Sequence, residues 1–229
     1  MTQHRRFTEV RRIKAVIFDF DGVILESADI KTEAFRELFS DHSERIKDIV
    51  EYHLANAGIS RYVKFRHIYS HFLKETLPKD KERELGERFS GLVLEKILAT
   101  PFVPGAREFL DDNKGRYMFF IASGTPEDEL RNIVLTRGLN GYFQEVCGSP
   151  REKKAIMKSI MEKYDLTQDE AVYVGDAESD RRAAKETGVV FVERKAGADP
   201  GTGSFIVRDM SGLNKILEKI EKLTYKESD

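Results

Sequence analysis

The sequence has no tryptophan and one cysteine among its 229 residues. The single cysteine, Cys147, cannot form an internal disulfide, which fits a reducing compartment. No apolar stretch approaches the ~18 residues that a membrane span needs, and no signal-peptide core is present. We therefore expect a cytoplasmic protein that has no membrane partner.

Neither sign of charge dominates, because 38 basic residues face 40 acidic ones. This balance gives no support for nucleic-acid binding as the main function. All of the histidines lie in the first third of the chain, the last being His71. The later strand-like segments therefore offer no imidazole for a catalytic triad or a metal site. Any catalysis there must use carboxylates and lysines.

Short apolar segments alternate with helical ones over most of the chain beyond residue 100, and one similar segment precedes residue 20. The predicted strands are Ala15–Phe18, Tyr117–Ala122, Gln144–Cys147, Ala171–Gly175, Val189–Val192 and Phe205–Val207. The predicted helices between them are Glu127–Thr136, Glu152–Tyr164 and Ser179–Glu186. This alternation predicts an α/β fold with a mainly parallel sheet that helices cover on both faces.

The segment between the first strand and the rest has a helical pattern and no convincing strand. Four helical segments are expected there, namely Asp29–Phe39, Ser43–Gly58 with Ser43 as the N-cap, Ser60–Thr76 and Asp80–Leu98. They predict a four-helix unit inserted into the sheet domain. The predicted organisation is a first core segment (1–23), the helical insertion (24–100) and a second core segment (101–229).

Polar side chains follow four of the predicted strands. Ligands of open α/β sheets bind beyond the carboxyl ends of the strands, so these residues are candidates for one site. They are Asp19 and Asp21, then Ser123 and Thr125, then Lys153 and Lys154, and finally Asp176 and Asp180.

A nucleophile, a divalent cation and a phosphate can use this set together. Two unit charges ~4 Å apart repel by ~4 kcal/mol at an effective dielectric constant near 20, so Asp19 and Asp176 beside a phosphate require positive charge. Mg²⁺ suits these oxygen ligands, and one of the two lysines adds a further charge. Asp19 is fixed by the strand and suits a nucleophile, whereas Asp21 suits a general acid and base.

The motifs "DFDGV", "ASGT", the lysine of "SPREKK" and "GDAESD" occur in that order, each after a predicted strand. In this respect the chain resembles the haloacid dehalogenase superfamily, specifically phosphatases of the β-phosphoglucomutase and phosphoglycolate phosphatase type with an inserted helical cap. The resemblance implies a Rossmann-like doubly wound core and Mg²⁺. It implies that Asp19, the backbone carbonyl of Asp21 and Asp176 hold the metal, and that Asp180 supports them.

Three further assignments complete the predicted site. Lys153 is favoured over Lys154 as the lysine that faces the phosphate. The stretch "GISRYVKF" is similar to the specificity loop of β-phosphoglucomutase-like proteins, so Arg61 and Lys64 are expected to bind substrate. Ser123 and Gly124 are expected to bind its phosphate.

The predicted function is Mg²⁺-dependent hydrolysis of a small phosphorylated metabolite, a phosphomonoester, through an aspartyl-phosphate intermediate. Dehalogenases lack the second aspartate and phosphonatases replace it, so Asp21 argues against both. A sugar phosphomutase shares the chemistry up to the aspartyl-phosphate, but Gly175-Asp176 stands where mutases carry an acidic pair, which favours hydrolysis. A second alternative is a phosphate-binding or regulatory module without useful turnover. The sequence contains no signal for the oligomeric state.

Overall fold

The computed structural model describes residues 12–197 and 205–226. Its strands are β1 (Ala15–Phe18), β2 (Met118–Pro126), β3 (Phe143–Ser149), β4 (Ala171–Gly175), β5 (Val190–Arg194) and β6 (Ile206–Val207). They form one sheet in the order β3-β2-β1-β4-β5-β6, and every neighbouring pair is parallel. The predicted mainly parallel α/β sheet is therefore confirmed.

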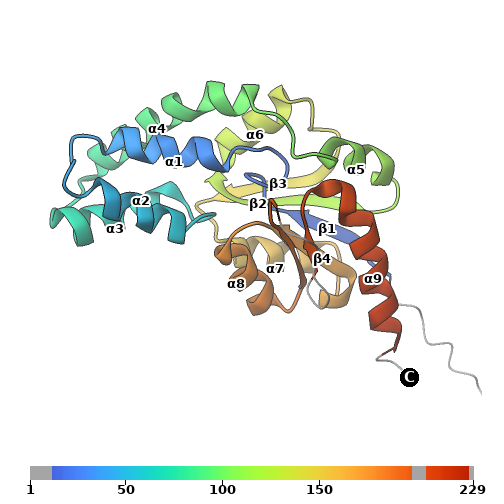
Figure 1. Cartoon of the computed structure of the whole chain (residues 1–229). Helices are drawn as coiled ribbons and strands as arrows, with labels where there is room; N and C mark the ends of the chain where they lie inside the picture. Colours follow the sequence, from blue (N-terminus) through green and yellow to red (C-terminus); the bar gives the residue numbers. More distant parts are fainter. Residues whose placement is uncertain (1–11, 198–204, 227–229) are drawn as a thin grey trace, which may run out of the picture.

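The helices before β2 are α1 (Ala28–Leu38), α2 (Ile46–Ala55), α3 (Arg61–His67), the π-helical turn η1 (Ile68–Leu73), α4 (Lys79–Ala99) and α5 (Ala106–Asn113). Those that follow β2 are α6 (Glu127–Thr136), α7 (Lys153–Lys163), η2 (Gln168–Glu170), α8 (Glu178–Thr187), η3 (Met210–Gly212) and α9 (Leu213–Lys226). Helices α1 to α4 lie together at one end of the molecule, beyond the sheet (Figure 1).

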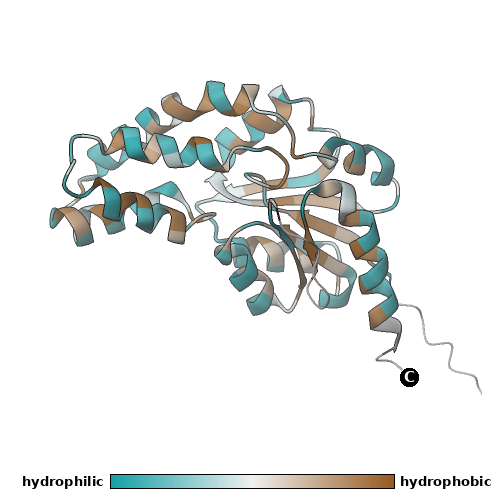
Figure 2. Cartoon of the chain, in the orientation of Figure 1, coloured by the Kyte–Doolittle hydropathy of each residue, from teal (hydrophilic) through white to brown (hydrophobic). Residues whose placement is uncertain are grey.

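Helices cover both faces of the sheet because its strands are apolar on both sides, as the brown strands in Figure 2 show. Val16 and Phe18 of β1 belong to a core that includes residues of α5, α6 and α9. Ala15 and Ile17 belong to a second core with residues of α7 and α8. The two cores fix β1 in the middle of the molecule, and β1 carries the chain directly into Asp19.

Some predicted helix ends differ from the observed ones. Ser43 is not an N-cap, because residues 43–45 form a turn and α2 begins at Ile46. The expected single helix Ser60–Thr76 is α3 followed by a π-helical turn that ends at Leu73. Helices α5 and α9 were not predicted.

The chain segments that enter and leave the helical insertion lie side by side. The backbone N–H of Glu26 donates to Pro101 O (3.1 Å), and that of Val103 donates to Ile24 O (3.0 Å). Arg194 of β5 also forms an ion pair with Glu26 at 2.5 Å. These pairs lie next to the proposed boundaries at 23/24 and 100/101.

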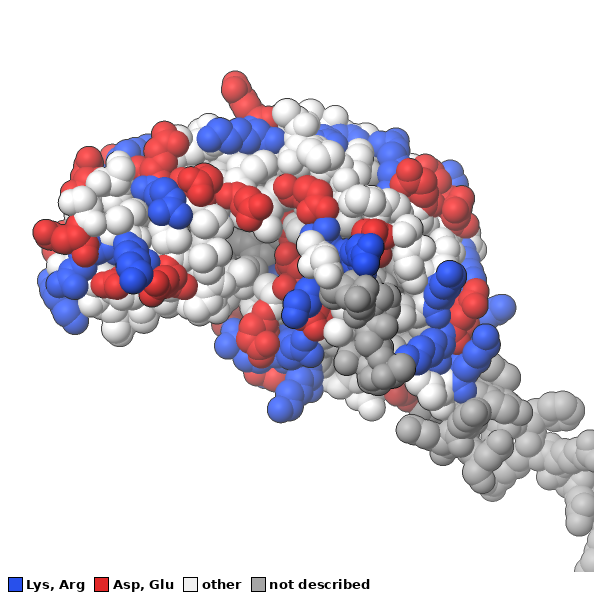
Figure 3. Space-filling model, viewed as in Figure 1, with Lys and Arg blue, Asp and Glu red and all other residues white. Residues whose placement is uncertain are grey.

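Charges are mixed over the face shown in Figure 3, where basic and acidic side chains alternate. Among the described residues, no helix combines the length and the apolar character that crossing a membrane requires.

Phe18→Ala tests the importance of the central strand. Phe18 is fully buried and packs edge-on against Phe109, Phe119 and Phe143. Removing the ring leaves a cavity, so we expect the free energy of unfolding in urea to fall by about 3–5 kcal/mol. The control Leu135→Ala, at a residue that is 61% exposed, should cost less than about 1 kcal/mol. Similar losses in the two variants would contradict this description of the core.

Candidate active site

The predicted acidic residues meet at the carboxyl ends of β1 and β4. These strands are neighbours at the centre of the sheet, where the strand order reverses, which is the usual ligand position in doubly wound folds. Asp19 directly follows β1 and Asp176 directly follows β4. One carboxylate oxygen from each of Asp19, Asp176 and Asp180 lies within 4.8 Å of the other two.

Lys153 supplies the positive charge between these carboxylates. It begins α7, is buried, and places its Nζ 3.0 Å from Asp19 Oδ2 and 2.6 Å from Asp180 Oδ1. Burial alone would lower the pKa of Lys153, but Asp180 and Asp19 outweigh burial and raise it. Lys154 is turned outward and pairs with Glu186 at 2.9 Å. Of the two lysines, Lys153 is therefore the one beside Asp19.

Asp180 is fully buried, and both of its carboxylate oxygens accept hydrogen bonds from neighbouring groups. Its Oδ1 accepts hydrogen bonds from Lys153 and from the Tyr173 hydroxyl (2.6 Å), and its Oδ2 accepts one from the backbone N–H of Ala177 (3.1 Å). These contacts suit a carboxylate that holds Lys153 in place. They make Asp180 a poorer metal ligand than Asp19 or Asp176, whose oxygens are less engaged.

Asp19 and Asp176 fit a hard cation. Asp19 Oδ1 is buried and has no hydrogen-bond partner among the described residues. Burial is the largest cause that raises the pKa of Asp19 to about 7, with Asp180 and Asp21 adding to it against Lys153. Burial and then Asp19 raise the pKa of Asp176 to about 8. The raised pKa values mean that the negative charges of these two carboxylates are not fully compensated by neighbouring groups. Mg²⁺ bound by both carboxylates would balance those charges.

Gly22 permits Asp176 to approach the loop after β1. Its φ is +75°, in the left-handed region that favours glycine. A Cβ at this position would lie 2.0 Å from Asp176 Oδ2. Any larger residue would therefore push Asp176 away from Asp19.

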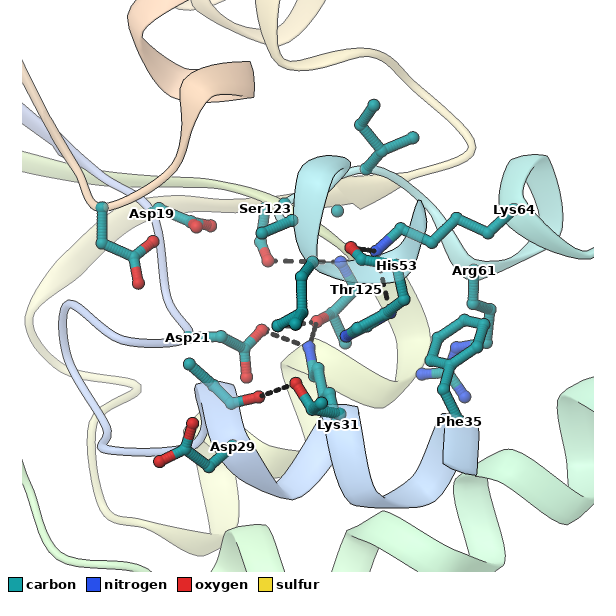
Figure 4. Close-up of a pocket in the computed structure, with 18 of the residues that line it drawn as sticks. Asp19, Asp21, Asp29, Lys31, Phe35, His53, Arg61, Lys64, Ser123 and Thr125 are labelled. Atoms are coloured by element: carbon teal, nitrogen blue, oxygen red, sulfur yellow. Dashed lines mark hydrogen bonds and ion pairs between the residues drawn. The ribbon is translucent and has the colours of Figure 1, made fainter. Parts of the chain in front are cut away.

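The carboxylate of Asp21 is held by neutral and cationic donors that include a lysine of the insertion. Ser27 Oγ donates to its Oδ1 (2.6 Å). Thr125 Oγ1 (2.9 Å) and Lys31 Nζ both donate to its Oδ2, and Figure 4 shows these two residues beside Asp21. Burial would raise the pKa of Asp21, but Lys31, Ser27 and Thr125 outweigh it and lower the pKa. Asp21 is therefore a fixed carboxylate in this conformation.

Lys31 is a site residue that sequence reasoning missed. It lies on α1 and also donates to Thr125 Oγ1 (2.6 Å), at the end of β2. Its only signal in the sequence was its place on the first helix after Asp21. Its contact depends on how that helix packs against the sheet, which no local pattern specifies.

Ser123 and Gly124 line the same pocket as Asp19 and Asp21. Both lie in β2, three or four residues before α6 begins at Glu127. The Ser123 hydroxyl is buried and accepts a hydrogen bond from the backbone N–H of Thr125 (3.2 Å). It can still donate its own proton to an anion in the pocket.

Arg61 and Lys64 line the pocket from α3 and are both buried. Arg61 is engaged by protein groups, since its guanidinium donates to Ser90 Oγ (2.8 Å) and to Glu129 Oε1 of α6 (2.5 Å). This ion pair joins the insertion to the sheet domain. Lys64 Nζ lies 3.2 Å from His53 Nδ1.

The site thus combines an acidic pair after β1, a hydroxyl near the end of β2, a lysine at the start of α7 and an acidic pair after β4. The family model for haloacid dehalogenase-like hydrolases matches residues 16–193, which contain all of these elements. The chain belongs to this family.

The relatives agree with this membership, and solved structures share the fold. The chain is 25% identical to the phosphorylated carbohydrates phosphatase of Thermotoga maritima, over 77% of this chain and 82% of that protein. It is 28% identical to the phosphoglycolate phosphatase of Vibrio parahaemolyticus, over 77% and 81%. The β-phosphoglucomutase of Clostridium difficile superimposes with a TM-score of 0.74 at 18% identity, over 93% of this chain and 99% of that one. A subfamily IA hydrolase from Geobacter sulfurreducens gives 0.60 at 20%, over 90% and 96%.

Asp176→Asn tests the repulsion between the acidic residues. Because their pKa values are raised, Asp19 and Asp176 keep protons in the folded chain that the unfolded chain releases near pH 4. The ionisation of these two groups therefore destabilises the fold as the pH rises toward 8. In EDTA, the variant should gain at least about 1 kcal/mol of unfolding free energy over the wild type between pH 5 and pH 8.

Thermal and urea unfolding at several pH values measure this difference. Mg²⁺ should stabilise the wild type more than the variant, because the variant has lost a charged ligand. Parallel pH profiles for the two proteins in EDTA would contradict the repulsion.

Proposed function

We propose that this protein hydrolyses small phosphomonoesters with Mg²⁺, through an aspartyl-phosphate formed on Asp19. The observation that carries the proposal is the meeting of Asp19 and Asp176, at the ends of neighbouring strands, with Lys153 beside Asp19. Within the part of the chain that the structure describes, Asp19 Oδ1 has no hydrogen-bond partner. A buried carboxylate that has a free oxygen and a lysine beside it suits attack on a phosphorus atom.

In the first step a carboxylate oxygen of Asp19 bonds to phosphorus, and the bond from phosphorus to the ester oxygen breaks. Asp21, once protonated, gives its proton to the leaving oxygen. In the second step Asp21 takes a proton from water, which attacks phosphorus and releases phosphate and the Asp19 carboxylate. Lys153, Ser123 and the Gly124 backbone are proposed to bind the phosphate oxygens.

The proposed metal ligands are Asp19, Asp176 and the backbone carbonyl of Asp21. Mg²⁺ bound there would offset the charge that phosphate brings to the acidic residues. Lys31 keeps Asp21 ionised in this conformation, so Asp21 must take up a proton before it can act as the acid.

The dimensions of the pocket favour a small substrate. Its volume is about 130 Å³, which is below the ~300–1,000 Å³ typical of sites for drug-sized ligands. The curated relatives in Thermotoga maritima and Vibrio parahaemolyticus are named as phosphatases of a carbohydrate phosphate and of phosphoglycolate. Both names support a small phosphorylated metabolite as substrate. Arg61 and Lys64 are proposed to contact its leaving group.

Asp19→Asn should abolish phosphate release, because an amide is a poor nucleophile. A loss of at least about 10³-fold in kcat is expected with a panel of phosphate esters and Mg²⁺. Acid quenching with a radiolabelled substrate should recover label on the wild-type protein and none on the variant.

The matched control is Asp112→Asn, at an exposed residue of α5, which should keep wild-type rates. An unchanged kcat in Asp19→Asn would contradict the aspartyl-phosphate mechanism. A wild-type protein that releases no phosphate from any ester with Mg²⁺ would favour a binding module over an enzyme.

Asp21→Asn should show its role through the leaving group. A general acid matters most for an alkoxide, which leaves poorly without a proton, so kcat/KM for an alkyl phosphate should fall by about 10²–10⁴-fold. The fall in kcat/KM for p-nitrophenyl phosphate should be at least about ten-fold smaller, since that leaving group needs little protonation. The ratio kcat/KM reports the steps up to release of the leaving group, before the hydrolysis step that both esters share. Equal losses of kcat/KM for the two substrates would remove Asp21 as the general acid.

A further inference from the structure

A cluster of side chains from the helical insertion lines the pocket on the side opposite Asp19. Phe35 of α1, His53 of α2 and Lys64 of α3 meet there, across the pocket from Asp19 (Figure 4). The centres of the His53 and Phe35 rings lie 4.2 Å apart, and Lys64 Nζ lies 5.4 Å from the centre of the Phe35 ring. A group attached to a phosphate at Asp19 would extend toward this cluster.

Lys64 differs from the other basic residues that line the pocket. Lys31 pairs with Asp21, and Arg61 pairs with Glu129. No carboxylate of the described residues lies within ion-pair distance of Lys64, although the residue is only 3% exposed. Its ammonium contacts His53 Nδ1 (3.2 Å) and His53 O (3.4 Å). A buried charge without a counter-ion is costly, so this position is suited to an anion supplied by a ligand.

The charges around Lys64 act in the same direction. Burial, followed by Lys31 and Lys153, lowers the pKa of Lys64 to about 7 against a smaller opposing effect of Asp21. Burial and the neighbouring lysines lower the pKa of His53 to about 3, so His53 is neutral and accepts from Lys64 through Nδ1. An anion bound here would raise the pKa of Lys64 and make it take up a proton.

We propose that Lys64, positioned by His53, binds a carboxylate on the leaving group, so that the substrates are phosphate esters of short hydroxy acids. This inference rests on the proposed function. A neutral hydroxyl would not supply the missing counter-charge. A second phosphate would bring more charge and bulk than one ammonium and a pocket of about 130 Å³ accommodate.

A pair of non-hydrolysable probes tests the proposal by calorimetry with Mg²⁺. 3-Phosphonopropionate carries a phosphonate and a carboxylate, and propylphosphonate replaces that carboxylate by a methyl group. The wild type should bind 3-phosphonopropionate at least about ten-fold more tightly. Lys64→Met should remove most of this preference. The control Lys47→Met, at a side chain of α2 that is 85% exposed, should keep it.

Proton uptake provides a second measurement on the wild type, in case Lys64→Met does not fold. The uptake is measured by calorimetry at pH 8 in two buffers of different ionisation enthalpy. Binding of 3-phosphonopropionate should be accompanied by uptake of a larger fraction of a proton than binding of propylphosphonate. Equal affinity of the wild type for the two probes would overturn the proposal, as would a preference that survives in folded Lys64→Met.

Phosphate release measured in parallel separates this proposal from the proposed function. Turnover of phosphate esters without any preference for the carboxylate probe would overturn the Lys64 assignment alone. Lys64-dependent binding of 3-phosphonopropionate by a chain that releases no phosphate would support the carboxylate site and refute the hydrolase.

Discussion

The buried ammonium of Lys153 forms the ion pairs on which the arrangement of the acidic residues depends. Lys153 lies between Asp19 and Asp180, and Asp176 adds a third carboxylate nearby. Three acidic groups and one lysine leave an excess of negative charge at the end of the central strands, in a place that is largely closed to water. A cation bound among these carboxylates would offset that excess, which is why the proposed function includes Mg²⁺.

Much of the sheet side of this site could be predicted from the sequence, because it depends on strand ends. Ala15–Phe18 and Ala171–Gly175 have the predicted bounds, and parallel strands deliver Asp19 and Asp176 to the same edge. Lys153 was harder, since its neighbour in sequence is also a lysine and only the start of α7 decides which one turns inward.

For the helical insertion, the sequence predicted that helices form but not which contacts they make with the rest of the site. Lys31 reaches Asp21 and Arg61 reaches Glu129 because the fold brings α1 and α3 close to the site. The positions of these helices come from contacts between segments far apart in the chain, for which one sequence gives no periodic signal. The roles proposed for Arg61 and Lys64 accordingly stay predictions, whereas their positions around the pocket are now described.

The paired segments at the base of the insertion also bear on how the chain folds. Ala15 of β1 pairs with Met118 of β2, so the central strand cannot dock until a long intervening stretch has been closed into a loop. Helices form from local contacts, and in the folded structure the ends of that stretch meet where Glu26 bonds Pro101. Early collapse of the four-helix unit would thus shorten the effective loop and speed assembly of the sheet.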